Sequence, residues 1–368
     1  MTRIAIMSSW NAACGVSTHA ELIGDALLRK GFDLTVFAPR QYVDDSTYLI
    51  NTSDEHYVKR VYDFQRYGDR YIDPNVLQSA YLDSKWILDT DFDLLLIEKP
   101  TSMPLPKLIK ILPKIKKKAK VIGIIHEGLP ILNPFFEKID WDALIIFDER
   151  YRKFLPSSWE SKIYTVPFPC YPLDSSYEAR KYSTDSEATR ILSYNRVHDL
   201  QLVLRGIEIA QREIGTIEYT LLLGSIDAYE QVKKYKNKYH FLDVKVDRPS
   251  KSTLRNIQCE SDVILFNTRR PTHIALSSSV HFCLSTLTPI LCNNVSYFDM
   301  FSGEVIKYGD CDDLSEKLVN LMRYGANKVL HKAEEYCKRY SADKISEQIL
   351  DIAFNKLNID ESTVQYHS

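Results

Sequence analysis

The sequence has no long apolar run, no closely spaced cysteines and almost no net charge, and each absence excludes a class of protein. No apolar stretch approaches the roughly 18 residues of a membrane-spanning helix. The seven cysteines are odd in number and include no Cys-x-x-Cys pair, which excludes a disulfide framework and a zinc site built on such pairs. Lys and Arg total 47 against 49 Asp and Glu, so the chain lacks the positive excess of a protein that coats nucleic acid. We therefore expect no nucleic-acid partner.

Glycine and proline are scarce as well, at 12 and 15 of 368 residues, which excludes collagen-like and low-complexity chains. This length predicts two domains of about 150 to 180 residues each. The N-terminal segment turns polar at Ser8, too soon for a signal peptide, so we expect a cytoplasmic protein. Peripheral contact with the inner face of a membrane is the alternative location.

Short apolar segments and helical patterns alternate along both halves of the chain. Alternation of this kind predicts parallel βαβ units, in which helices cover both faces of each sheet. The expected strands are residues 3–7, 33–37, 94–97, 121–125, 143–147 and 164–167 in the first half, and 190–193, 219–223, 262–266 and 289–292 in the second. We predict an α/β protein with two Rossmann-like, doubly wound parallel-sheet domains.

A proline-containing and polar stretch separates the two halves. Pro167, Pro169 and Pro172 are followed by residues 174–187, which are rich in Ser, Asp, Tyr and Glu. We therefore predict an N-terminal domain over 1–172, a linker over 173–189, a second domain over 190–340 and a helical C-terminal segment over 341–368.

Seven short segments, spread over nearly the whole chain, match the motifs of one enzyme family. They are the loop and helix start at 13–22, the strand entry at 30–36, the strand end at 124–127, the stretch at 163–170 ahead of the linker, and the segments 193–196, 288–291 and 340–341. Together they resemble the retaining GT-B glycosyltransferases of family 4 (glycosyl transferases group 1). The resemblance implies two domains that face each other across a cleft, with the final helix crossing back to the first domain.

The resemblance also implies an activity. Such an enzyme moves a sugar from a nucleotide-diphosphate sugar to a carbohydrate or glycolipid acceptor with retention of configuration, and it needs neither a metal nor a cofactor. The first domain would bind the acceptor and the second the donor. Two other functions stay open: a non-catalytic GT-B subunit that binds a partner or glycan, and a nucleotide-sugar epimerase or phosphorylase of the same fold.

The donor half departs from the family pattern at two places, which is why the alternatives stay open. The family has a Lys a few residues beyond the Arg that corresponds to Arg196, whereas this chain has His198, Asp199 and Gln201 in that region. The family also has two Glu residues eight positions apart, and here His273 and His281 have that spacing. An imidazole can replace a carboxylate as hydrogen-bond acceptor only while it is unprotonated. The alternative is that His281 is a core residue and His273 a loop residue.

Two places in the first half are candidate ligand contacts. Gly15, followed by Val16, lies between the first strand and its helix, where backbone N–H groups can approach a phosphate of the donor; a plain turn is the alternative. His126 ends a strand that must be buried, at the sheet edge where ligands bind, and its ring can bond a sugar hydroxyl. We predict that His126 is a catalytic residue that orients the transferred sugar rather than a general base, with a core histidine as the alternative.

The candidate donor contacts of the second half are mostly cationic. Arg196 follows a predicted strand and could stabilise charge on the diphosphate leaving group, with His198 beside it and Arg270 as a helper. Ser277 and Ser278 precede an apolar helix, whose first N–H groups attract phosphate; a helix cap without a ligand explains the same residues.

The segment from 107 to 120 is strongly basic. Its lysines are Lys107, Lys110, Lys114, Lys116, Lys117, Lys118 and Lys120, and apolar residues lie between them. A basic amphipathic helix can lie on anionic lipid. Pro113 would interrupt one continuous helix, however, and we expect two shorter helices if the segment is helical. A crossover helix with a solvated lysine face is the preferred interpretation.

Overall fold

The computed structural model describes residues 1–40, 53–65, 79–126, 128–131, 133–173, 188–194, 198–274 and 276–357. The chain divides into two compact units, residues 1–169 with 340–368 and residues 170–339, which we call the N-terminal and C-terminal units. Residues 174–187 of the predicted linker lie outside the described residues. In the described ranges, no helix is both long and apolar enough to span a membrane.

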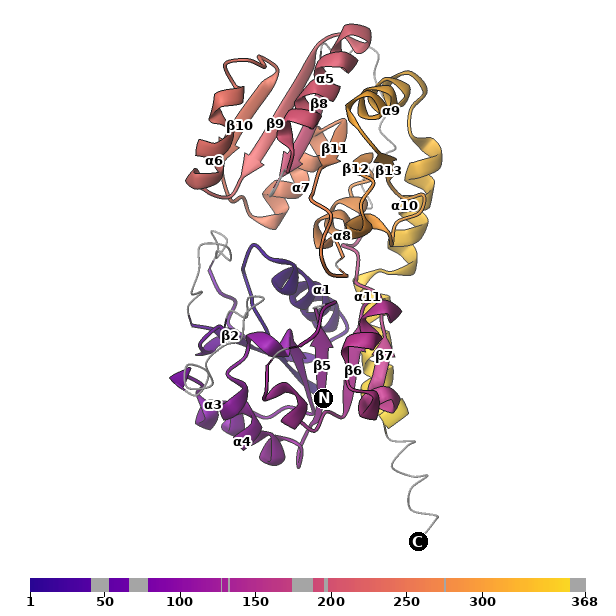
Figure 1. Ribbon diagram of the computed structural model, residues 1–368. Coiled ribbons are helices and arrows are strands. Elements are labelled where there is room, and N and C mark those ends of the chain that lie inside the picture. Colours follow the sequence, from indigo (N-terminus) through magenta and orange to yellow (C-terminus); the bar gives the residue numbers. More distant parts are fainter. Residues whose placement is uncertain are drawn as a thin grey trace. The chain divides into compact units, whose positions relative to one another are not determined.

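The N-terminal unit contains a seven-stranded, fully parallel sheet (Figure 1). Its strands are β1 (Arg3–Met7), β2 (Asp33–Pro39), β3 (Val58–Tyr62), β4 (Leu94–Glu98), β5 (Lys120–Ile125), β6 (Ala143–Ile146) and β7 (Ile163–Thr165). They are ordered β3-β2-β1-β4-β5-β6-β7. The central strands β4, β5 and β6 are buried almost throughout, as apolar runs in a sheet covered on both faces must be.

Among its described residues, the N-terminal unit also contains four α-helices and several short 3-10 or π-helical elements. The α-helices are α1 (Gly15–Arg29), α3 (Ser84–Asp89), α4 (Leu105–Ile115) and α11 (Ala342–Asp351). The short elements are η1 (Pro100–Ser102), η2 (Phe136–Lys138), η3 (Glu149–Phe154), η4 (Ser157–Lys162) and the π-helical η7 (Ile352–Lys356). Helix α11, which lies near the C-terminal end of the sequence, packs against α1. Exposed ion pairs at 2.9 Å and 2.5 Å join Arg29 to Asp343 and Lys30 to Glu347.

The C-terminal unit contains a second parallel sheet, with six strands in the order β10-β9-β8-β11-β12-β13. The strands are β8 (Thr189–Tyr194), β9 (Ile217–Leu223), β10 (Leu242–Val246), β11 (Val263–Phe266), β12 (Ile290–Asn293) and β13 (Ile306–Tyr308). The helices are α5 (Leu200–Ile214), α6 (Ile226–Val232), η5 (Lys233–Tyr235), α7 (Lys251–Glu260), α8 (Ser278–Leu284), η6 (Ser296–Phe298), α9 (Cys311–Tyr324) and α10 (Asn327–Arg339). The prediction of two doubly wound parallel-sheet domains is therefore confirmed.

The C-terminal sheet has an apolar layer on each face, and β11 contributes to both. Val263 and Leu265 belong to the layer that includes α5 and α9, whereas Ile264 and Phe266 belong to the layer that includes α8 and α10. This is the period-2 alternation of a strand buried on both faces. Helices α5 and α9 pack closely because position 206 is Gly: a Cβ there would lie 2.9 Å from the carbonyl oxygen of Cys311.

The basic segment contains one helix, α4, which runs through Pro113 to Ile115 and is followed by a turn and by β5. The prediction that Pro113 would require two shorter helices is therefore wrong. Pro113 lies in the last turn of α4, where its missing N–H costs a single helical hydrogen bond. The apolar side chains of this helix, including Leu108 and Ile111, are buried within the N-terminal unit. Two lysines of the turn after this helix hold neighbouring loops: Lys116 pairs with an Asp140 oxygen at 2.6 Å, and Lys118 donates to backbone carbonyls. These contacts favour the crossover helix with a lysine face over lipid contact.

Candidate functional site

In both sheets, the strand order reverses beside the first strand of the unit. In the N-terminal unit the chain moves outward in opposite directions from β1 and β4, and in the C-terminal unit from β8 and β11. Crevices at the carboxyl ends of strands at such switch points are where open α/β sheets bind ligands. The loops that follow β1, β4, β8 and β11 are therefore the first places to look for a site.

The loop after β1 is held in one conformation by a buried glutamate from the next helix. The Glu21 carboxylate accepts a hydrogen bond from the Asn11 backbone N–H at 3.0 Å and another from the Ser17 hydroxyl. The Ser17 oxygen in turn accepts the Ala12 N–H at 3.0 Å. Asn11 itself has a φ of 52°, in the left-handed region. The loop is therefore a fixed structure rather than a generic connection.

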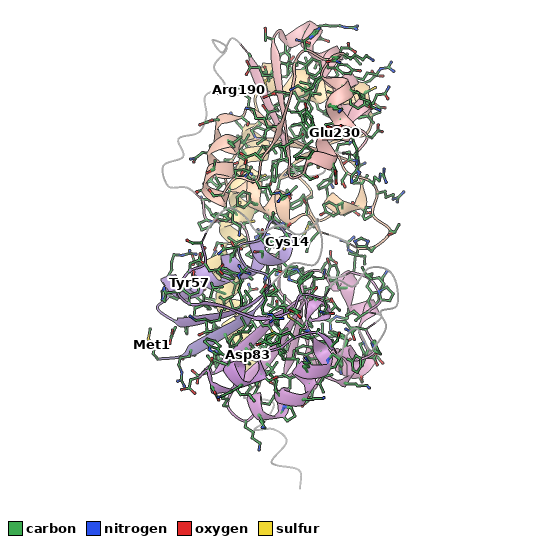
Figure 2. All side chains as sticks on the ribbon, turned by 90° about the vertical axis from the view of Figure 1, so that its left-hand side faces the viewer. Met1, Cys14, Tyr57, Asp83, Arg190 and Glu230 are labelled. Atoms are coloured by element: carbon green, nitrogen blue, oxygen red, sulfur yellow. The ribbon has the colours of Figure 1, made fainter. Side chains whose placement is uncertain are left out.

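Helix α1 begins where this loop ends, with Cys14 as its N-cap (Figure 2). Gly15 and Val16 are its first two residues and are half-buried. Their backbone N–H groups find no partner among the described residues, as is normal for a first helical turn. The N-terminal end of a 15-residue helix carries partial positive charge, so this is a suitable place for a phosphate or hydroxyl oxygen.

The switch point of the N-terminal unit contains a buried carboxylate between two imidazoles. Glu98 is the last residue of β4 and is fully buried. One of its oxygens lies 2.7 Å from Nδ1 of His19, which α1 buries against the sheet. The other lies 2.6 Å from Nε2 of His126, which directly follows β5 and whose side chain is 10% exposed. The predicted site residue His126 is therefore one end of a three-residue hydrogen-bonded chain, His19–Glu98–His126.

Two phenylalanine rings pack against the histidines of the His19–Glu98–His126 hydrogen-bonded chain. The Phe147 ring centroid lies 4.9 Å from that of His19 and 4.9 Å from that of His126. Phe168 packs against His19 at 5.1 Å and against Phe147 at 5.3 Å. Apolar rings lower the local dielectric constant, which strengthens the hydrogen bonds and makes an unpaired charge there costly.

The surroundings of Glu98 favour its ionised form. Burial alone would raise the pKa of Glu98, but the interactions with His19 and His126 outweigh burial and lower it from 4.5 to about 2. An ionised carboxylate can only accept hydrogen bonds, so both facing nitrogens must carry protons. This requirement assigns the proton to Nδ1 of His19 and to Nε2 of His126. Glu98 thereby fixes both the tautomer and the orientation of the His126 ring.

The same three residues are the one group in the described ranges whose ligand atoms could surround a metal, all lying within 4.8 Å of one another. The distances favour hydrogen bonds instead. Tetrahedral ligands bound to zinc at about 2.0–2.1 Å lie about 3.3 Å apart, whereas each nitrogen here is 2.6 or 2.7 Å from its own carboxylate oxygen. The nitrogens also face different oxygens, as in two separate donor–acceptor pairs.

Backbone strain concentrates at the switch points. Among the described residues, the non-glycine residues with positive φ are Asn11, Lys99, Asp199 and Leu287. The first three follow β1, β4 and β8, and Lys99, at φ 47°, comes directly after Glu98. Such a conformation costs about 1 kcal/mol or more for each residue, and it occurs preferentially at functional sites.

The switch point of the C-terminal unit is closed by side-chain to backbone hydrogen bonds. Predicted contact Arg196 lies outside the described residues. The His198 N–H donates to the carbonyl of Asn267 at 2.9 Å, and the Asn267 amide donates back to the His198 carbonyl. The Tyr308 hydroxyl donates to the side-chain oxygen of Asn267 at 2.9 Å. His198 is therefore placed at the predicted edge of the sheet, and Asn267 holds its backbone.

The remaining predicted donor contacts divide into exposed and buried residues. Arg270 and His273 are exposed on the loop after β11 and have no hydrogen-bond or ion-pair partner among the described residues. Ser277 is buried and caps α8 by accepting the Val280 N–H at 3.2 Å, and half-buried Ser278 begins the helix.

The prediction that His281 contacts the donor does not agree with its position. The side chain is fully buried, with Nδ1 donating to the Ser277 carbonyl at 2.8 Å. Its Nε2 lies 3.3 Å from the Tyr336 hydroxyl, and the Phe301 ring packs on it at 5.0 Å. Both nitrogens are thus engaged inside the core, which supports the alternative that His281 is a core residue of α8.

Sequence reasoning missed Glu98 and His19, although one signal could have found Glu98. It ends an apolar strand just as His126 does, and a charged residue in that place must be paired. His19 belongs to the family-like segment 13–22, but nothing in that motif marks it as a partner of Glu98. In the C-terminal unit, the missed residue is Asn267, which holds the backbone of His198.

No protein-family model matches the sequence. The structure is similar to a glycosyltransferase from Rickettsia africae, with TM-score 0.63, 11% identity and coverage of 95% of this chain and 97% of that chain. It is also similar to the pneumococcal O-GlcNAc transferase GtfA in complex with UDP and GlcNAc, with TM-score 0.60, 10% identity and coverage of 95% of this chain and 98% of that chain. A third similar structure is Anabaena HepE in complex with UDP and glucose, with TM-score 0.59, 9% identity and coverage of 95% of this chain and 99% of that chain. This whole-length similarity shows that the chain has the GT-B fold.

Proposed function

We propose that this protein is a glycosyltransferase that moves a sugar from a nucleotide-diphosphate sugar to a glycan, glycolipid or related acceptor. The observation that carries the proposal is the match of the whole chain, both units included, to solved glycosyltransferases. Two of the similar proteins were solved with UDP and a sugar, which makes UDP-sugars the first donors to test. We further propose retention of configuration and metal-independent chemistry, following the family 4 resemblance.

In this proposal, His126 orients the transferred sugar and Glu98 orients His126. The His126 ring ends β5 at the sheet edge, and its Nε2 is 2.6 Å from the buried carboxylate. A ring held in one orientation can bond a sugar hydroxyl without losing rotational freedom at each turnover. His19 is bound to the other carboxylate oxygen and fixes Glu98 in turn. Glu98 and His19 are therefore positioning residues, and His126 is the residue that touches substrate.

The donor diphosphate would be held by cations and by backbone N–H groups. Arg270 and His273 are accessible on the loop after β11, and Arg196 and His198 follow β8 in the sequence. In the N-terminal unit, the first N–H groups of α1, at Gly15 and Val16, are separately available to an oxygen atom of a ligand. Charge develops on the leaving diphosphate during the reaction, so preorganised donors and guanidinium groups there lower the barrier.

Binding of nucleotide diphosphates tests this proposal against the scaffold alternative. Thermal unfolding would be measured with UDP, GDP, ADP and the matching nucleosides, each titrated to saturation. A ligand at 100 times its dissociation constant adds about 2.7 kcal/mol to the free energy of unfolding, which is a readable shift. We expect one diphosphate to raise the melting temperature more than its nucleoside does. No shift with any nucleotide diphosphate would contradict the proposal and favour a GT-B scaffold.

A further inference from the structure

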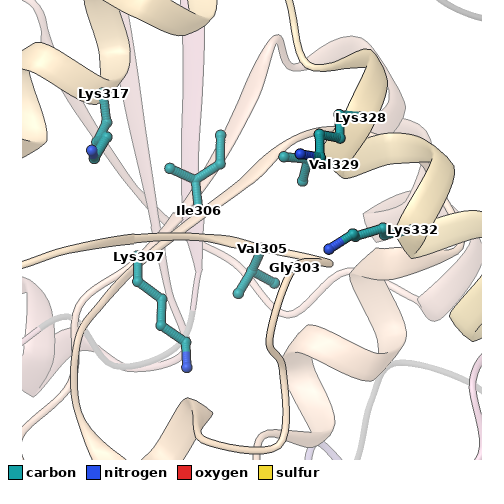
Figure 3. Close-up of a pocket in the computed structure, with 8 residues that line it drawn as sticks. All are labelled: Gly303, Val305, Ile306, Lys307, Lys317, Lys328, Val329 and Lys332. Carbon is teal, nitrogen blue, oxygen red and sulfur yellow. The ribbon is translucent and has the colours of Figure 1, made fainter.

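A groove on the C-terminal unit is lined by four lysines from three different elements. It is formed by Gly303, Val305, Ile306, Lys307, Lys317, Lys328, Val329 and Lys332, with a volume of about 340 Å³ (Figure 3). Lys307 lies on β13, Lys317 on α9, and Lys328 and Lys332 on α10. In Figure 3 Lys332 reaches from α10 toward Gly303 and Val305, Lys328 ends beside Val329, and Lys317 lies beyond Ile306. We call these eight residues the lysine groove.

No carboxylate lines the lysine groove, and the acidic groups nearby in sequence already have partners. Lys317 pairs with Asp313 at 3.5 Å, but that carboxylate also accepts the Gly309 N–H. Glu304 accepts the N–H groups of Ser302 and Gly303. Within the described ranges, Lys307, Lys328 and Lys332 have no ion pair. Lys116 and Lys338 are examples of described lysines that do pair with a carboxylate.

The two lysines of α10 occupy positions where helix electrostatics disfavours them. Lys328 is in the first turn, where the helix dipole is positive and no acidic residue offsets it. Lys332 follows four residues later, so the pair are like-charged neighbours on one helix face. Lys332 also extends over Gly303, where a Cβ would lie 2.5 Å from its Nζ. An anion in the groove would relieve both repulsions.

We propose that the lysine groove binds a phosphate group carried by a small ligand. Lys328 and Lys332 would contact the phosphate, since lysine ammonium groups bind phosphate as compact charges. Val305, Ile306 and Val329 give the groove an apolar floor for the rest of the ligand. Its volume is at the small end of the range for ligand sites. The groove begins before β13 and is separate from the carboxyl edge of the sheet, where Asn267 and His198 lie.

Affinity labelling of the full-length protein with pyridoxal 5′-phosphate tests the groove directly. Its aldehyde condenses with an unprotonated lysine amine to an imine and water, and borohydride then adds hydride to give a stable secondary amine. Peptide mass spectrometry identifies the labelled lysines. We expect Lys328 or Lys332 to be labelled about tenfold more than Lys110 and Lys114, exposed lysines of α4, and inorganic phosphate to suppress that labelling. Even labelling without protection by phosphate would overturn the proposal.

A matched pair of double variants provides the second readout. Lys328→Gln with Lys332→Gln removes two charges from the groove, and Lys110→Gln with Lys114→Gln removes two from α4. Calorimetric titration with glycerol 3-phosphate should lose about tenfold in affinity in the first variant only. Co-sedimentation with phosphatidic acid vesicles shows whether the phosphate belongs to a lipid headgroup instead. Equal glycerol 3-phosphate affinity and equal vesicle binding of the two variants would overturn the proposal that the lysine groove binds phosphate.

UDP binding should be the same in wild type and in the groove variant. That result separates failure of the groove from failure of the proposed transferase function. A loss of UDP affinity in the groove variant alone would overturn the claim that the groove is a separate site.

Discussion

The substitution Glu98→Gln removes one buried charge from the His19–Glu98–His126 chain and preserves its shape. The pKa of Glu98 is lowered from 4.5 to about 2 in the folded protein, against the opposing effect of burial. That difference corresponds to about 3 kcal/mol of stability when the carboxylate is ionised in both states. A Gln amide can bond both imidazoles only if one of them changes its tautomer. We therefore expect the variant to be less stable by about 3 kcal/mol at pH 7.

The pH dependence separates this charge effect from a packing effect. A carboxyl whose folded pKa is depressed stabilises the protein fully above its unfolded pKa, and the contribution is lost as pH falls toward the folded pKa. The stability difference between wild type and Glu98→Gln should therefore shrink by about 1.4 kcal/mol per pH unit below pH 4.5. A difference below about 0.5 kcal/mol at pH 7, or one that does not change between pH 5 and pH 3.5, would refute the reasoning.

Tryptophan fluorescence measured during urea unfolding reports on the N-terminal unit, which contains Glu98. All four tryptophans belong to the N-terminal unit, at Trp10, Trp86, Trp141 and Trp159. Glu160→Gln is a matched control, because it also neutralises a glutamate of this unit but one whose side chain is 62% exposed and pairs with Arg152. An exposed ion pair contributes less than about 1 kcal/mol, so this control should barely move the urea midpoint.

Three further substitutions test how the units are packed, one in the C-terminal unit and two on α11 of the N-terminal unit. Gly206→Ala should destabilise the C-terminal unit by about 1–3 kcal/mol, since its Cβ would lie 2.9 Å from the Cys311 carbonyl; circular dichroism in urea measures this, and an unchanged transition would contradict close α5–α9 packing. Ile345→Ala should cost about 2–4 kcal/mol, since Ile345 is fully buried on α11. Glu347→Gln, on the same helix, should cost less than about 1 kcal/mol; a larger loss for Glu347 in tryptophan-detected urea unfolding would mean that ion pairs hold α11 to α1.

The fold could be predicted because apolar runs and helical periodicity alternate strongly along the chain. Buried parallel strands such as β4 and β5 are nearly all apolar. A polar residue ends β4 and another directly follows β5, which marks the carboxyl edge of the sheet. The same signal placed His126 at the carboxyl edge of the sheet, directly after β5. Pro113 misled the reading of α4, since a proline in a last helical turn removes only one hydrogen bond.

The site could be predicted only in part, because partners distant in sequence decide it. Glu98 lies 79 residues from His19 and 28 from His126, so no local pattern shows that one carboxylate serves both rings. His281 has the spacing of a family glutamate, yet tertiary packing engages both of its nitrogens in the core. Spacing along a chain does not determine which way a helical side chain faces when the helix is short and buried on most sides.

Following a UDP-sugar by proton NMR tests the central claim most directly, because the anomeric proton reports the fate of the sugar. Wild-type protein with donor and an acceptor mixture should release UDP and give a new anomeric signal with the configuration of the donor. His126→Gln should lower that rate by about tenfold or more while UDP affinity is unchanged, since His126 is proposed to orient the sugar and not to hold the nucleotide. A sugar that is epimerised without acceptor, or a donor that stays intact across a full panel of nucleotide sugars, would contradict the proposal that this protein is a glycosyltransferase.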